Sequence, residues 1–150
     1  MDTYRMHDKD ANTENTVKRR HGIHGLVYGR TTNLILAAAY RVHGHLGPGL
    51  LERVYHTCLC HELLRMGIPY ESEKPLPVVY DGVSMELGFR VDILVETKVI
   101  VEVKAVEQIL PVHESQLLSY LRLSGARVGL LINFNSANLR DGIRRRVLGY

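Results

Sequence analysis

The sequence predicts an α/β fold in which a central mixed sheet of four to five strands is flanked by helices on its faces. Three observations support this prediction. Apolar residues recur at helical spacing up to about residue 66, and several short runs rich in Val and Ile follow. A strand, a helix and a strand then succeed one another up to residue 134. That order implies a right-handed crossover between parallel strands, whereas strands linked by tight turns pair antiparallel.

The chain has 150 residues, 45% of them apolar, which fits a single domain with a substantial core. It contains no apolar run long enough to span a bilayer, and its start lacks the apolar core of a signal peptide. We therefore expect a cytoplasmic protein with no membrane partner. The net charge of +3 permits a nucleic-acid partner without requiring one, and a homo-oligomer is also possible.

The first third of the chain predicts an arm and two helices. Residues 1–30 are polar and lack apolar periodicity, so we expect a flexible N-terminal arm preceding a domain over 31–150. A helix should follow, capped by Thr31 or Thr32. After a turn at Gly47, a second helix should run over about 50–66 with an apolar stripe. The predicted stripe comprises Leu51, Val54, Tyr55, Cys58, Leu59, Leu63 and Met66.

The middle of the chain predicts antiparallel strands. Asp81-Gly82 lies between two β-prone runs and predicts a hairpin. Two further strands are expected at about 88–95 and 98–106.

The last third predicts a helix, a buried strand and a basic tail. The helix should cover about 112–124, following Pro111 and ending before Gly125. A buried strand is expected over 128–134, and a short basic helix over 140–148.

Three charges within the two middle strands require an explanation. Asp92 lies in RVDILV, and Glu102 and Lys104 lie in VIVEVKAV. If Val95 pairs with Val99, Asp92 lies opposite Glu102 and the two carboxylates share one face. Two carboxylates at such a short distance repel each other unless a cation lies between them. Oxygen ligands suit Mg2+ or Mn2+, while an ion pair between Lys104 and either acid is the alternative.

Two helices offer further polar residues to this site. His113, Gln116 and Tyr120 are spaced by three and four, so they form one stripe along the last predicted helix. Glu52 borders the apolar stripe of the second helix and could reach the sheet as a further metal ligand, or could simply favour the helix dipole. Phosphate contacts are possible at four positions: Arg90, His113, Arg144 and Arg145.

The chain also resembles a known family. The GxxExxY protein family has a signature similar to the stretch from Val42 to Leu59, VHGHLGPGLLERVYHTCL, with Gly49, Glu52 and Tyr55 at the named positions. Similarity continues through GFRVDILVETKVIVEVKAVEQILPVHESQLLSYL and VGLLINF, so it covers about residues 30–148. That family is assigned to the PD-(D/E)XK nuclease superfamily, so the resemblance implies a restriction-endonuclease-like core of order α-β-β-β-α-β.

The resemblance also implies roles for individual residues. It makes Asp92, Glu102 and Lys104 the catalytic triad and Glu52 the acid of the first helix. Gln116 and Tyr120 match the QxxxY motif of RecB-type nucleases. Two positions depart from the family pattern, with Val91 in place of the proline and Asn135 in place of a glycine after the last strand.

We therefore predict a Mg2+- or Mn2+-dependent phosphodiester hydrolase acting on DNA or RNA. Asp92, Glu102, the Val103 carbonyl and Glu52 would hold the metal. Lys104 would orient water or stabilise the transition state, and Gln116 and Tyr120 would position substrate or the lysine. The alternatives are a catalytically silent module on the same fold that binds nucleic acid or protein, and a homo-oligomer in which the charged strands are structural.

Overall fold

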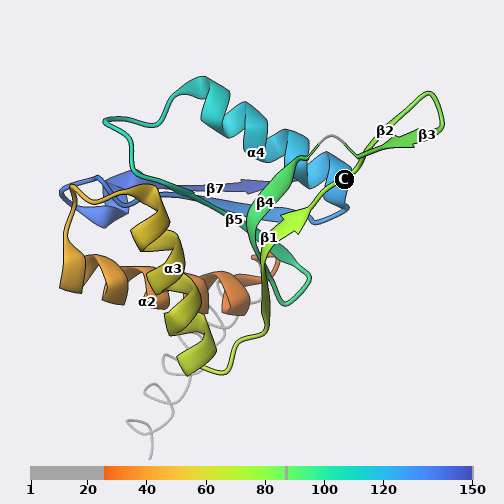
Figure 1. Cartoon of the computed structure of the whole chain (residues 1–150). Helices are drawn as coiled ribbons and strands as arrows, with labels where there is room; N and C mark the ends of the chain where they lie inside the picture. Colours follow the sequence, from red (N-terminus) through yellow and green to blue (C-terminus); the bar gives the residue numbers. More distant parts are fainter. Residues whose placement is uncertain (1–25, 87, 150) are drawn as a thin grey trace, which may run out of the picture.

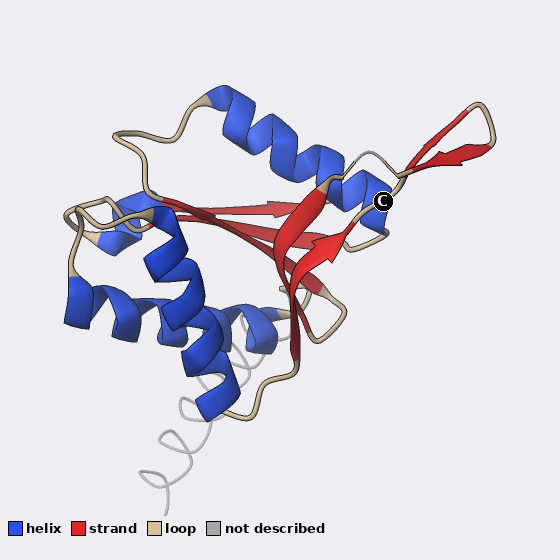
Figure 2. Ribbon diagram, in the orientation of Figure 1, coloured by secondary structure: helices blue, strands red, loops and turns tan. Residues whose placement is uncertain are grey.

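The computed structural model describes residues 26–86 and 88–149 and has the predicted α/β architecture. A five-stranded sheet has the order β1 (Tyr70–Pro75), β4 (Arg90–Val95), β5 (Val99–Lys104), β6 (Val128–Asn133) and β7 (Ile143–Val147). Helices α2 (Gly29–Leu46) and α3 (Glu52–Arg65) lie on one face of the sheet, and α4 (Pro111–Ser124) lies on the other (Figure 1). The layers are also distinct when the elements are coloured by type (Figure 2). None of the described helices has the length and apolar character needed to span a bilayer.

The two N-terminal helices confirm the helical prediction but correct two details. The N-cap of α2 is Tyr28, so the prediction that Thr31 or Thr32 caps this helix was wrong. Both threonines are buried, and Thr31 donates to the Glu96 carboxylate at 3.1 Å. The buried face of α3 differs from the predicted apolar stripe. Leu51, which precedes the helix, is 77% exposed, and Cys60, which was not predicted, is buried.

The middle strands have the predicted register. β4 (Arg90–Val95) and β5 (Val99–Lys104) pair antiparallel, with Val95 opposite Val99 and Ile93 opposite Val101. The odd-numbered valines of β5 pack against α2 and α3, while Ile100 packs against α4. Because side chains alternate along a strand, Glu102 lies on the α4 face.

An edge strand that was not predicted pairs with β4. β1 (Tyr70–Pro75) has the polar sequence YESEKP and runs antiparallel to β4. The hairpin predicted at Asp81-Gly82 is present as β2 (Val78–Tyr80) and β3 (Val83–Met85). It forms a separate two-stranded sheet that projects away from the domain (Figure 1).

The crossover to β6 (Val128–Asn133) confirms the mixed sheet, because β6 pairs parallel to β5. The prediction of a basic C-terminal helix was wrong. A 3-10 turn, η1 (Leu139–Gly142), leads instead into the strand β7 (Ile143–Val147), which pairs antiparallel with β6. Its apolar residues Ile143 and Val147 pack against the core, and the arginines between them alternate between the two faces. The predicted N-terminal arm lies largely outside the described residues.

Candidate active site

Asp92 and Glu102 face each other where the ladder between β4 and β5 ends. The last paired residues are Ile93 and Val101, so Asp92 and Glu102 occupy the next position in the same register. The Asp92 backbone N–H donates to Oε1 of Glu102 at 3.1 Å, and the Val103 N–H donates to Oδ2 of Asp92 at 2.8 Å. Each carboxylate therefore accepts a hydrogen bond from the backbone of the opposite strand.

Glu102 is buried in an unfavourable environment for a negative charge. Its exposed fraction is 4%. Burial, followed by the repulsion of the neighbouring Asp92 carboxylate, raises the pKa of Glu102 to about 8, although the hydrogen bond from Asp92 and the charge of Lys104 act in the opposite direction. A cation bound beside the pair would relieve both causes.

Lys104 follows Glu102 at the end of β5 and is half-buried. Within the described residues its ammonium group forms no hydrogen bond or ion pair, so the alternative of a Lys104–carboxylate pair is not realised there. Its charge nevertheless lowers the pKa of both Glu52 and Glu102, which places it near both acids. This ammonium is available to a ligand.

Glu52 begins α3 and lies near the strand pair. Partial burial of its carboxyl raises the pKa, the charge of Lys104 lowers it, and Asp92 raises it further. Across residues 26–86 and 88–149, no three His, Cys, Asp or Glu side chains are gathered closely enough to bind one metal ion. Glu52 is therefore an electrostatic neighbour of the pair and does not complete a ready-made shell with it.

Tyr55 fixes the turn that presents Glu52. Its hydroxyl donates to the Gly47 carbonyl at 2.6 Å and accepts from the Leu50 N–H at 3.0 Å. Its buried ring stacks on Phe134, with centroids 4.8 Å apart. Gly49 has a φ of +103°, which side-chain-bearing residues rarely adopt. The spacing of Gly49, Glu52 and Tyr55 thus has a local structural reason.

Of the predicted stripe on α4, Tyr120 packs on the sheet face that carries Glu102, whereas Gln116 is exposed. Gln116 Nε2 donates to the Tyr120 hydroxyl at 3.0 Å. Tyr120 is 7% exposed, and its pKa is raised by burial and then by the charges of Glu102 and Asp92, with Gln116 acting in the opposite direction. Tyr120 therefore lies within electrostatic range of the carboxylate pair. His113 lies one turn before Gln116 on this helix.

Asn133 supports the segment after Lys104 and was missed by the sequence predictions. It is 2% exposed at the end of β6, where it pairs with Lys104. Its Oδ1 accepts from the Val106 N–H at 3.0 Å, and its Nδ2 donates to the Val106 carbonyl at 2.9 Å. Asn135 adds a 3.3 Å bond to that carbonyl. The sequence signal that could have identified Asn133 is a polar residue at the end of the otherwise apolar strand β6.

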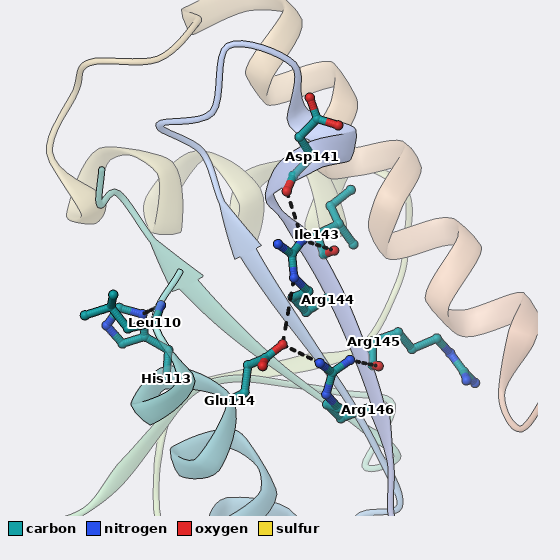
Figure 3. A network of polar contacts seen from close by, with 8 residues as sticks. All are labelled: Leu110, His113, Glu114, Asp141, Ile143, Arg144, Arg145 and Arg146. Carbon is teal, nitrogen blue, oxygen red and sulfur yellow. Dashed lines mark hydrogen bonds and ion pairs between the residues drawn. The ribbon is translucent and has the colours of Figure 1, made fainter. Parts of the chain in front are cut away.

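The arginines predicted to contact phosphate are dispersed. Arg90 begins β4 and is exposed, with its guanidinium 4.0 Å from the Glu73 carboxylate. Arg144 donates to the carbonyls of Asp141 and Ile143. Arg145 points to the other face of β7 and donates to the Val27 carbonyl at 2.6 Å (Figure 3). The structure therefore does not gather Arg90, Arg144 and Arg145 into one cluster.

The comparisons with known proteins agree with this geometry. The family model described as PD-(D/E)XK nuclease superfamily matches residues 29–146. Neither a search of curated proteins nor a search of solved structures found a match. The match spans all described strands and helices up to β7, including the acid pair, Lys104 and Glu52. The chain therefore belongs to the PD-(D/E)XK nuclease superfamily.

Proposed function

We propose that this chain is a divalent-metal-dependent nuclease that hydrolyses phosphodiester bonds in DNA or RNA. The observation that carries the proposal is the pairing of half-buried Asp92 with buried Glu102, near a Lys104 ammonium that forms no hydrogen bond or ion pair among the described residues. If Lys104 had a purely structural role, we would expect its ammonium to pair with one of the carboxylates. Membership of the nuclease superfamily supports the same conclusion.

The residues of the pair fit a hard divalent cation. Asp92 and Glu102 supply carboxylate oxygens, the Val103 carbonyl is a further candidate ligand, and Glu52 is near enough to assist. Mg2+ or Mn2+ suits this all-oxygen set. When bound, such an ion lowers the pKa of a coordinated water and offsets charge on the attacked phosphate.

The remaining residues would orient the reactants. Lys104 would donate from Nζ to the attacking water or to a phosphate oxygen on which charge develops. Gln116 holds the Tyr120 hydroxyl, which would position substrate or the lysine. The Tyr55 hydroxyl holds the turn before Glu52 and so fixes the start of α3, where this acid lies.

We further infer that the chain falls in the GxxExxY branch of the superfamily and that residues 31–150 form the nuclease domain. Gly49, Glu52 and Tyr55 have the spacing of that signature, and the contacts of Tyr55 supply a physical reason for it.

Cleavage assays test the function. Single- and double-stranded DNA and RNA should be incubated with the protein in Mg2+, Mn2+ or EDTA. We expect metal-dependent cleavage by the wild type and a loss of roughly 100-fold or more in Lys104→Ala, with both proteins unfolding at nearly the same temperature. Binding without cleavage in any metal would identify the alternative, a silent nucleic-acid-binding module.

A further inference from the structure

His113 has its ring proton fixed by the start of α4. The N-cap residue is Leu110, and its backbone N–H donates to Nδ1 of His113 at 2.9 Å, while the His113 N–H donates to the Leu110 carbonyl at 3.0 Å (Figure 3). A nitrogen that accepts an N–H cannot itself carry a proton. The ring proton therefore lies on Nε2, which acts only as a donor.

The Nε2–H group of His113 has no hydrogen-bond partner among the described residues. The half-buried ring borders a cavity of about 490 Å3. The other walls of this cavity are Val106, Glu107, Gln108 and Leu110, and the first of these lies two residues after Lys104. The cavity thus begins where the strand carrying Glu102 and Lys104 ends.

The position of His113 on α4 also connects it with the acid pair. It lies on the same helical stripe as Gln116 and Tyr120, and Tyr120 packs on the sheet face that carries Glu102. Glu107 borders the cavity as well, but this residue is exposed, where water and salt screen its charge.

We propose that His113 is a substrate-binding residue whose Nε2–H donates a hydrogen bond to a phosphate oxygen of the nucleic-acid strand lying in this cavity. The proposal rests on the proposed function and extends it by one subsite. The phosphate bound here is next to the one being cut, because the cavity adjoins the end of β5 rather than the acid pair itself. A neutral donor positions this phosphate without adding a counter-charge.

Three substitutions separate this role from helix capping. Gln and Glu are the residues preferred at the third position of a capping box, so His113→Gln and His113→Glu both keep the cap. Only Gln also keeps a neutral N–H donor. Gln108→Glu is the matched control, because it adds a negative charge to the same cavity while leaving His113 intact.

The measurements are oligonucleotide Kd in Ca2+ and in EDTA, KM and kcat for cleavage in Mg2+, and thermal unfolding. We expect His113→Gln to stay within roughly threefold of wild type in Kd and KM. We expect His113→Glu to weaken both by roughly tenfold or more, with a smaller change in kcat, and by clearly more than Gln108→Glu does. All three should unfold at the wild-type temperature.

Equal values for His113→Gln and His113→Glu would overturn the proposal in favour of capping alone. An equal loss in Gln108→Glu would overturn it in favour of long-range repulsion. If the wild type binds oligonucleotides without cutting them, the nuclease function fails, yet the difference in Kd between the variants still decides the role of His113. A wild type that binds no oligonucleotide would overturn both.

Discussion

Asp92 and Glu102 hold each other across β4 and β5 through backbone hydrogen bonds rather than through a shared counter-ion. The Asp92 N–H donates to the Glu102 carboxylate, and the N–H of the residue after Glu102 donates to the Asp92 carboxylate. The sheet therefore fixes both acids before any ligand arrives. Fixed acids in a desolvated position favour the binding of a cation, because neither side chain has to be ordered on binding.

Metal affinity should depend on pH through Glu102. Its pKa of about 8 means that a proton must leave before the carboxylate can bind a cation. We expect the Kd for Mn2+ to weaken by about tenfold for each pH unit below 8. Calorimetry between pH 6 and 8 in two buffers of different ionisation enthalpy would measure both the Kd and the protons released.

Two variants control this experiment. Glu102→Gln should bind Mn2+ weakly at every pH and release no proton. Asp92→Ala should lose most of the affinity, because it removes one of the two paired carboxylates. Unchanged Mn2+ binding by Asp92→Ala would show that the metal, if bound, lies elsewhere.

The same acid should make the fold less stable at high pH. Between about pH 4.5 and 8 the folded state keeps a proton on Glu102 that the unfolded chain has lost, so the free energy of unfolding falls as pH rises through this window. Glu102→Gln should remove this slope and stabilise the metal-free protein by on the order of 3 kcal/mol at pH 7.

Denaturant unfolding at pH 5 and pH 7.5 in EDTA measures this effect. Glu107→Gln is the matched control, because this glutamate is exposed in the loop that follows β5, and we expect a change within about 0.5 kcal/mol. A Glu102→Gln variant less stable than wild type at both pH values would contradict the destabilising role of the buried carboxyl.

Lys104 should be needed for cleavage and not for folding. Its ammonium has no partner among the described residues, so Lys104→Ala should leave the thermal unfolding temperature within about 2 °C of wild type. Cleavage should fall by roughly 100-fold or more. Lys104→Arg keeps the charge but changes its shape and should recover part of the rate. A large loss of stability in Lys104→Ala would instead favour a structural role.

The geometry of the candidate site could be predicted from sequence, because its strands and helix obey local rules. The hairpin register follows from placing Val95 opposite Val99, which puts Asp92 opposite Glu102. The helix α4 is delimited by Pro111 and Gly125, and its Gln116–Tyr120 spacing is one turn. Such features need only neighbours along the chain.

The errors occurred where distant contacts decide the structure. β1 is an exposed, polar edge strand, and only its pairing with β4 makes it a strand. The run of arginines in β7 is typical of a basic helix when read alone. In the structure Arg144 and Arg146 both form ion pairs with Glu114 of α4 (Figure 3). Thr31 has the residue type and position of a helix N-cap, but its hydroxyl donates a hydrogen bond to Glu96, which is 65 residues away in the sequence.

Asn133 should couple stability to activity. Asn133→Ala removes the acceptor of the Val106 and Asn135 N–H groups, whereas the Val106 carbonyl keeps its bond from Asn135. This loss in a partly buried site should cost about 1–3 kcal/mol. Cleavage should also fall, because the segment after Lys104 loses its anchor to β6. Chemical denaturation and cleavage rates would be compared with Asn135→Ala, which removes a single 3.3 Å side-chain bond and should have a smaller effect on both. Equal effects of the two variants would show that Asn133 is not the main anchor.

Gly129 should set the distance between α4 and the sheet. A Cβ at this position of β6 would lie 2.6 Å from Cδ1 of Leu117, whose side chain is fully buried. Gly129→Ala should therefore destabilise the fold by about 1–3 kcal/mol and push α4 outward. Because α4 carries Gln116 and Tyr120, cleavage should fall with stability.

A double-mutant cycle with Leu117→Val tests this reason, because the shorter side chain makes room for the new methyl group. The double variant should be more stable than the sum of the two single effects predicts, and it should regain part of the lost cleavage. Strict additivity would mean that the two side chains do not compete for the same space. Recovered stability without recovered cleavage would separate the packing of α4 from the alignment of Tyr120 with Glu102.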